Sequence, residues 1–257
     1  MKILKKIFLL FVFLLLPTVV WAHFGCILPS NSMVDQSKRT IYVTFSFIHP
    51  FEQNGMDLAK PEVLKMVNLS KGTKVNLLRK IRPITFLGHK AWKAKVRIKR
   101  PGVYCIYMVP KPYWEPAEDK FIKHITKTYV AAFGEEEGWD KPLGLKTEIV
   151  PLTRPFGLYA GNVFQGQVLL DNKPVPNCWV EVEYFNKGSK VKAPNEYMVT
   201  QVIRTDSQGV FTFAAPLPGW WGFAALNEAD YTLKHNGEQK PVELGAVIWV
   251  QFLPINK

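Results

Sequence analysis

The chain has 257 residues, with 33 Lys and Arg residues against 21 Asp and Glu residues, a formal net charge of +12. A balance this positive indicates either a polyanion or membrane-surface partner or a solvated basic face. The cations are spread along the chain, and their densest run, Lys90 to Arg100, alternates with apolar residues as one exposed strand would. We therefore favour the solvated face and expect no nucleic-acid partner.

The first predicted element is an export signal. Three lysines precede an unbroken apolar run over residues 7–16, and Val20 and Ala22 occupy the two positions that a signal peptidase reads. A membrane-spanning helix needs about 20 apolar residues, more than this run contains. We expect residues 1–22 to be removed and a periplasmic chain, not inserted in the membrane, to start at His23. Without the three lysines the formal charge is (33 − 3) − 21 = +9.

Strand-like runs follow along the rest of the chain, and they predict an all-β fold. They are rich in Val, Ile, Thr and aromatic residues and are bounded by Gly, Pro, Asn or Asp. Helical periodicity is weak, and Lys60 to Val67 is the one candidate helix. The predicted strands cover residues 40–48, 92–98, 103–109, 121–132, 162–170, 178–184, 199–205, 210–214, 220–226 and 245–252.

The strands divide into two predicted domains. Two prolines and a glycine lie within Pro151 to Gly157, which is typical of a stiff connector. We expect an N-terminal β-sandwich over 23–150, a linker over 151–158 and an Ig-like or transthyretin-like sandwich over 159–257. In the second sandwich, Asp206 to Gly209 has the sequence of a turn that joins two strands.

The three cysteines, Cys26, Cys105 and Cys178, cannot all pair with one another. An oxidising compartment permits one bridge, for which Cys26 and Cys105 are the candidate pair, and buried free thiols are the alternative. No C-x-x-C pair is present, so neither a zinc ribbon nor a redox pair is indicated. The chain also lacks a phosphate-binding loop, a dinucleotide glycine fingerprint and a nucleophile elbow.

His23 is the strongest candidate metal ligand, because signal cleavage would give it a free α-amine. The amine and the imidazole Nδ1 of one residue can close a chelate ring on a single ion. Deprotonating both groups costs only about 1 kcal/mol at pH 7 and roughly 6 kcal/mol at pH 5. The alternative is that cleavage exposes a histidine by chance.

Further ligands are expected from the same half of the chain. His49 ends an apolar strand, and Pro50 stiffens the exit so that Glu52 could reach the same side. His124 lies in a strand that follows the acidic turn 115–119. Nitrogen and carboxylate donors suit Ni(II), Co(II), Cu(II) or Zn(II). For His49 and His124 the alternative is a hydrogen-bonded structural histidine, and His89 and His235 are interpreted as turn residues.

Several strings, taken together, resemble a known family. The strings are His23-Phe24-Gly25, His49-Pro50-Phe51-Glu52-x-x-Gly55-Met56, Pro112-Tyr113-Trp114-Glu115-Pro116-Ala117-Glu118-Asp119, Gly138-Trp139-Asp140-x-Pro142, Thr147-Glu148-Ile149-Val150-Pro151-Leu152-Thr153-Arg154-Pro155 and Gly219-Trp220-Trp221-Gly222-Phe223. The mature chain resembles the NikK-type periplasmic components of energy-coupling-factor importers for nickel and cobalt. The resemblance implies a non-catalytic protein that binds nickel, or cobalt, and supports uptake by membrane components of the importer. It also implies His23, His49 and His124 as ligands, with Glu52 a weaker candidate.

Two other functions remain open at this point. An N-terminal histidine brace on a β-sandwich is also typical of copper polysaccharide monooxygenases, which would show turnover with reductant and oxygen. A metal-free scaffold or adhesion module would retain less than one nickel ion per chain on dialysis.

Overall fold

A computed structural model describes residues 23–255, and these residues form a layered all-β fold with one short 3₁₀ helix, η1 (Glu196–Met198). The predicted signal segment, 1–22, lies outside the described residues. Within the described part of the chain, no helix is long and apolar enough to cross a membrane. The all-β prediction is confirmed.

The first layer is a five-stranded antiparallel sheet from the N-terminal half, here called sheet one. Its order is β1-β3-β8-β7, with β4 paired to β3. The strands are β1 (Phe24–Pro29), β3 (Thr40–His49), β4 (Asn54–Met56), β7 (Ile81–Phe86) and β8 (His89–Arg97).

The middle layer is an 11-stranded sheet, the central sheet, that runs through both halves of the chain. Its main order is β17-β16-β19-β22-β11-β9-β5-β6, with β2 and β10 paired to β11 and β13 paired to β22. The strands are β2 (Met33–Val34), β5 (Val63–Asn68), β6 (Thr73–Asn76), β9 (Gly102–Val109), β10 (Tyr113–Glu115), β11 (Lys120–Ala132), β13 (Leu158–Tyr159), β16 (Trp179–Tyr184), β17 (Gln201–Arg204), β19 (Gly219–Glu228) and β22 (Val242–Leu253).

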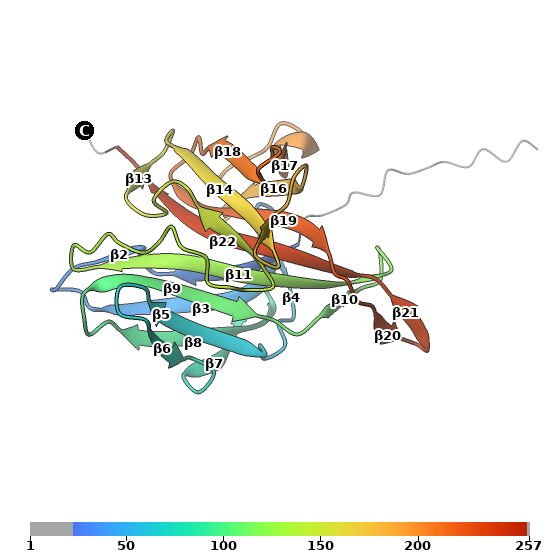
Figure 1. Ribbon diagram of the computed structural model, residues 1–257, viewed down its shortest axis with the longest axis horizontal. Helices are drawn as coiled ribbons and strands as arrows, with labels where there is room; N and C mark the ends of the chain where they lie inside the picture. The colour runs from blue at the N-terminus through green and yellow to red at the C-terminus, as the bar shows by residue number, and fades with distance from the viewer. Residues whose placement is uncertain (1–22, 256–257) are drawn as a thin grey trace, which may run out of the picture.

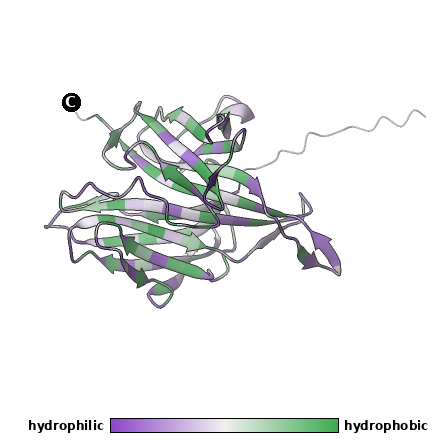
Figure 2. Ribbon diagram, in the orientation of Figure 1, coloured by the Kyte–Doolittle hydropathy of each residue, from purple (hydrophilic) through white to green (hydrophobic). Residues whose placement is uncertain are grey.

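The third layer is a four-stranded sheet, sheet three, above the other face of the central sheet (Figure 1). It contains β12 (Thr147–Pro151), β14 (Val163–Leu170), β15 (Lys173–Pro174) and β18 (Val210–Ala214). A separate hairpin, β20 (Leu233–His235) with β21 (Glu238–Lys240), projects from the body and is largely hydrophilic (Figure 2).

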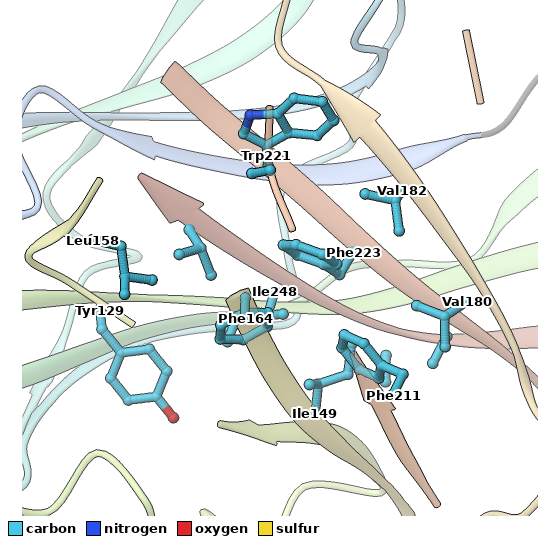
Figure 3. Packing of buried hydrophobic residues seen from close by; sticks show 14 of the residues in the cluster. Tyr129, Ile149, Leu158, Phe164, Val180, Val182, Phe211, Trp221, Phe223 and Ile248 are labelled. Carbon is cyan, nitrogen blue, oxygen red and sulfur yellow. The ribbon is translucent and has the colours of Figure 1, made fainter. Parts of the chain in front are cut away.

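The central sheet is shared by two sandwiches because its strands alternate their side chains between two cores. On β9, Tyr104 and Ile106 belong to the core against sheet one, whereas Val103 and Cys105 belong to the core against sheet three. The second core is rich in aromatic residues, with Phe164, Phe211 and Phe223 close together (Figure 3).

The two halves are joined through strand pairing, not only through the connector. β11 pairs in parallel with β22 over eight residue pairs, from Phe121↔Val242 to Thr128↔Trp249. β12 already pairs with β14, so the second sandwich begins before the predicted linker. A buried ion pair between Lys127 and Glu148, with Nζ and Oε2 2.5 Å apart, joins β11 of the central sheet to β12 of sheet three.

The candidate helix is wrong, and of the two alternatives for the cysteines the structure has the buried free thiols. Residues 63–68 form β5 in place of the candidate helix, because Leu64 and Met66 face the core with the period of a strand. The candidate pair Cys26 and Cys105 forms no bridge: all three cysteines are free and buried, and these two lie in different core clusters. The predicted turn at Asp206 is confirmed, since its side chain accepts hydrogen bonds from the backbone of Gln208 and Val210.

Candidate metal centre

The candidate centre lies where the start of β1 and the end of β3 meet the β10–β11 hairpin. The imidazoles of His23 and His49 lie 4.6 Å apart between ring centroids. The Phe47 ring stacks on His23 at 5.5 Å and meets His124 edge-on at 5.9 Å. All three predicted histidines are therefore brought to one place, around Phe47.

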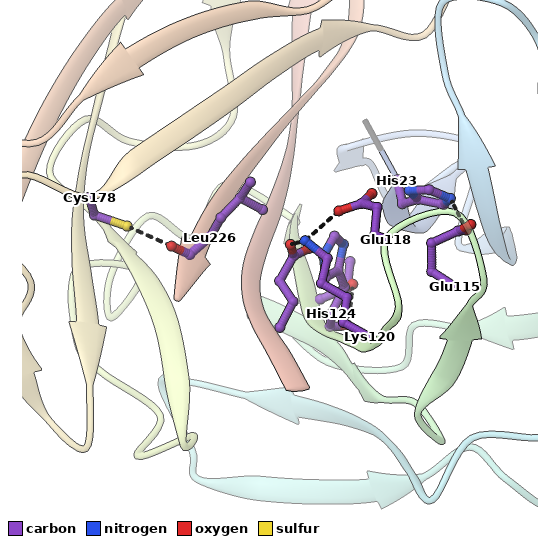
Figure 4. A network of polar contacts seen from close by, with 9 residues as sticks. His23, Glu115, Glu118, Lys120, His124, Cys178 and Leu226 are labelled. Atoms are coloured by element: carbon purple, nitrogen blue, oxygen red, sulfur yellow. Dashed lines mark hydrogen bonds and ion pairs between the residues drawn. The ribbon is translucent and has the colours of Figure 1, made fainter. Parts of the chain in front are cut away.

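His23 is held by a carboxylate. Its Nε2 lies 2.9 Å from Oε2 of Glu115, and both side chains are only 10% exposed (Figure 4). Burial lowers the pKa of His23, Glu115 opposes that effect, and the charge of His124 adds to it. With Nε2–H donating to Glu115, the lone pair is on Nδ1, which is the nitrogen that can chelate a metal together with the α-amine of the same residue.

His124 is held in the same way from the neighbouring strand. Its Nε2 lies 2.9 Å from Oε1 of Glu243 on β22, and its side chain is 1% exposed. The other ring nitrogen, Nδ1, is buried without a hydrogen-bond partner among the described residues. A buried polar nitrogen of this kind is costly to leave unpaired. Metal-ligating histidines use this arrangement, in which one ring nitrogen donates its N–H to a carboxylate and the other offers its lone pair to the metal.

Two further charged residues, Lys120 and Glu118, form ion pairs next to Glu243. Lys120 Nζ lies 2.7 Å from Glu243 and 2.5 Å from Glu118 (Figure 4). Burial by itself would raise the pKa of Glu243, but hydrogen bonds from His124 and Lys120 outweigh it and hold that pKa at about 2. Glu243 is therefore a fixed negative charge at neutral pH, which favours a donor N–H on His124 Nε2.

Two glycines make room for His124. A Cβ at Gly245, its neighbour on β22, would lie 2.3 Å from His124 Cδ2. A Cβ at Gly25 on β1 would lie 3.1 Å from His124 Cβ and 2.2 Å from Thr126 Oγ1. The side chain of His124 thus occupies space that any larger residue at these positions would take.

A cavity of about 40 Å³ adjoins the centre and is lined in part by Gly25, Phe47, Tyr113 and His124. This volume has room for a water molecule or an ion of similar size. Among residues 23–255, no three His, Cys, Asp or Glu side chains are gathered to hold an ion by themselves. The side chains of His23, His49 and His124 therefore lie near one another without already forming a three-histidine cluster. The α-amine of His23, a backbone group that exists only after cleavage before this residue, would be a further donor.

The fourth predicted ligand, Glu52, lies elsewhere. It lines a separate pocket with Phe51, Asn186 and Glu196. Burial raises its pKa, with a contribution from Glu196, and the pKa of Glu183 is raised by burial with a contribution from the charge of Glu52. The carboxylate beside His23 is Glu115 instead, from the acidic turn that the sequence placed before His124.

The two turn histidines are outside the centre. His89 lies 3.4 Å from Asp57 on the β7–β8 hairpin side. His235 stacks on Trp114 with ring centroids 3.8 Å apart.

Sequence reasoning missed Glu243 and Lys120. Glu243 is 119 residues from His124, and only the pairing of β11 with β22 brings it there.

A family model described as "Domain of unknown function (DUF4198)" matches residues 20–229. The chain belongs to the DUF4198 family. The match spans the candidate centre apart from Glu243, and the family description assigns no activity. No curated protein matches the chain.

Solved structures give distant similarities to this DUF4198 chain. The D0-D1 domain of intimin is 13% identical, covering 90% of this chain and 100% of its own, with a TM-score of 0.26. A two-domain fibronectin type-III segment of chicken tenascin is 12% identical, covering 88% of this chain and 98% of its own, with a TM-score of 0.23. A Salmonella alpha-2-macroglobulin is 9% identical, covering 88% of this chain and 15% of its own, with a TM-score of 0.28. At these values the similarities carry no argument about the site.

Proposed function

We propose that this DUF4198 protein is exported and binds one divalent metal ion, nickel or cobalt, for delivery to a membrane importer. The ion is cargo, and the protein carries out no chemistry on it. The donors would be the α-amine and Nδ1 of His23, an imidazole nitrogen of His49 and Nδ1 of His124. The single observation that carries the proposal is the buried, unpartnered Nδ1 of His124, whose ring packs against Phe47 and is held by Glu243.

The donor set suits the proposed metals. Four nitrogen donors are typical of tetragonal Ni(II) or Cu(II), and the absence of thiolate from the set disfavours Cu(I). Cys26 lies nearby in β1, but burial raises the pKa of its thiol, so it is a core residue and not a thiolate ligand. Nitrogen sites hold Cu(II) more tightly than Ni(II), so a copper preference in vitro would not identify the cargo.

The carboxylates strengthen the proposal through the orientation of the ligands. Glu115 and Glu243 each engage an Nε2, which fixes the tautomer and leaves the Nδ1 lone pairs of His23 and His124 for the metal. The resemblance to NikK-type components adds that the ion would be taken up by the cell and that the partner would be an energy-coupling-factor importer.

Equilibrium dialysis of the processed chain, residues 23–257, against Ni(II) tests the proposal. We expect one ion per chain, and clearly weaker retention after His49→Ala or His124→Ala. His235→Ala is the matched control, because the ring of His235 packs on Trp114 and Phe121 and not on the predicted ligands, so its loss should leave nickel binding unchanged. Retention below one ion per chain would instead support a metal-free scaffold.

A further inference from the structure

The positive charge of this chain is concentrated in one segment. Residues 63–114 hold 13 of the 33 Lys and Arg residues and no Asp or Glu at all. The rest of the chain holds 33 − 13 = 20 cations against 21 acids, so the whole positive excess lies in this segment. Strands β5 to β8 hold seven of these 13 cations, four of them on β8, and β6, β7 and β8 lie together on the side remote from sheet three (Figure 1).

Four of these cations share the outer face of sheet one, and we call Arg82, Lys93, Lys95 and Arg97 the basic face. Lys93 pairs with Arg82 on β7, and all four side chains are exposed. Residues paired across strands point to the same side of a sheet. The intervening residues of β8, such as Ala94 and Val96, face the core.

The basic face lacks neutralising partners. Among residues 23–255, none of its four side chains forms an ion pair with a carboxylate. Lys93 and Lys95 instead lie over the exposed ring of Tyr42, at 5.2 and 5.9 Å. Like charges on adjacent strands oppose folding, so the arrangement indicates a surface that meets an anionic partner.

An apolar groove of about 700 Å³ adjoins the basic face. Leu28, Phe86, Leu87, Tyr184, Phe185 and Trp220 contribute most of its apolar lining. Thr44 also lines it and pairs directly with Lys93 on one side and Leu28 on the other. Leu28, Thr44 and Lys93 thus form one row of paired residues across sheet one, and this row connects the groove to the basic face.

We propose that the basic face and this groove dock the protein on a bilayer that contains anionic phospholipids. Clustered Lys and Arg side chains are attracted to an anionic lipid surface, and aromatic side chains such as Trp and Tyr bind at the boundary between headgroups and acyl chains. A nucleic acid would use the cations but has no use for an apolar groove. The proposal does not depend on the metal centre.

Vesicle co-sedimentation of residues 23–257 tests the docking. Vesicles of phosphatidylcholine with phosphatidylglycerol should bind the protein, and vesicles of phosphatidylcholine alone should bind it at least tenfold more weakly. Each cation near an anionic surface is worth about fivefold in binding. The triple variant Lys93→Glu/Lys95→Glu/Arg97→Glu should therefore lose roughly hundredfold or more.

The matched control is Lys141→Glu/Lys173→Glu/Lys234→Glu, which makes the same change in net charge at exposed positions outside the basic face. It should lose less than about fivefold. Equal losses in the two variants, or equal binding to both vesicle types, would overturn the proposal. Circular dichroism of both variants shows whether they are folded, and a folded basic-face variant that binds like the parent chain also overturns it.

The groove is tested separately. Trp220→Ala keeps every charge and should remove the part of vesicle binding that survives about 0.5 M salt, where charge attraction is screened. Inorganic phosphate at matched ionic strength should not displace the protein, because phosphate offers no apolar phase. Unchanged high-salt binding of Trp220→Ala, or displacement by phosphate, would show that a bilayer is not the partner of this surface.

Discussion

Replacing Glu243 with glutamine separates the role of this carboxylate in holding His124 from its role in stability. Glutamine keeps the shape but removes the charge that fixes the Nε2–H tautomer of His124. Loss of an outer carboxylate of this kind lowers metal affinity by about 10- to 100-fold. We therefore expect Glu243→Gln to weaken nickel binding by that factor at pH 7, measured by isothermal titration calorimetry.

The same substitution should destabilise the metal-free protein in a pH-dependent way. The pKa of Glu243 is about 2 in the folded chain against an ordinary 4.5, a difference equivalent to about 3 kcal/mol. A lowered carboxyl pKa contributes stability above pH 4.5, and that contribution is lost as the pH falls towards 2. Urea unfolding followed by tryptophan fluorescence should show a deficit of about 1–3 kcal/mol at pH 7 that shrinks at pH 3.

Glu118→Gln is the control, because Glu118 also pairs with Lys120 but makes no contact with His124 among the described contacts. It should change nickel affinity by no more than severalfold. If Glu243→Gln lowers stability and leaves nickel affinity intact, His124 is not a ligand and the reasoning fails.

Four further outcomes are expected. Nickel affinity should fall about hundredfold or more from pH 7 to pH 5 because the α-amine becomes protonated, while the lowered pKa of His23 keeps its imidazole neutral further into acid; a flat profile in calorimetry would contradict amine ligation. Gly245→Ala should displace His124 and abolish tight nickel binding in the same assay. Lys127→Met should leave the buried Glu148 carboxylate with backbone N–H donors from Leu143 and Gly144 but without its cation, and cost about 3 kcal/mol in urea unfolding. A loss under about 1 kcal/mol would contradict a contribution of the buried ion pair to stability. The three cysteines should resist a thiol reagent at pH 8 in the native protein, since burial raises the pKa of each thiol, and all three should react in urea, whereas a single reactive thiol would indicate a bridge.

Most individual strands could be predicted from the sequence because alternation and turn residues are local signals. The runs at 40–48 and 121–132 correspond closely to β3 and β11. The pairing of β11 with β22 could not be predicted, since parallel partners more than a hundred residues apart leave no local pattern. The shared central sheet, and with it the linkage of both halves, follows from that pairing.

The candidate centre could be predicted only in part, because some of its residues have local sequence signals and others are brought in by long-range strand pairing. His23, His49 and His124 stood out as chemistry-bearing residues at strand ends or beside acids, and the structure gathers them around Phe47. Glu52 was chosen because it follows His49 closely, but the chain turns after Pro50 and places it in the pocket with Glu196. The supporting carboxylate Glu243 comes from a distant strand and had no sequence signal.

The most direct test of the account is the nickel affinity of two chains that differ by one residue at the N-terminus. One begins at His23, and the other carries a single added alanine before it, which converts the α-amine into an amide and leaves every side chain in place. We expect the extended chain to bind nickel at least tenfold more weakly in isothermal titration calorimetry. Equal affinities would contradict the chelate formed by the amine and imidazole of His23.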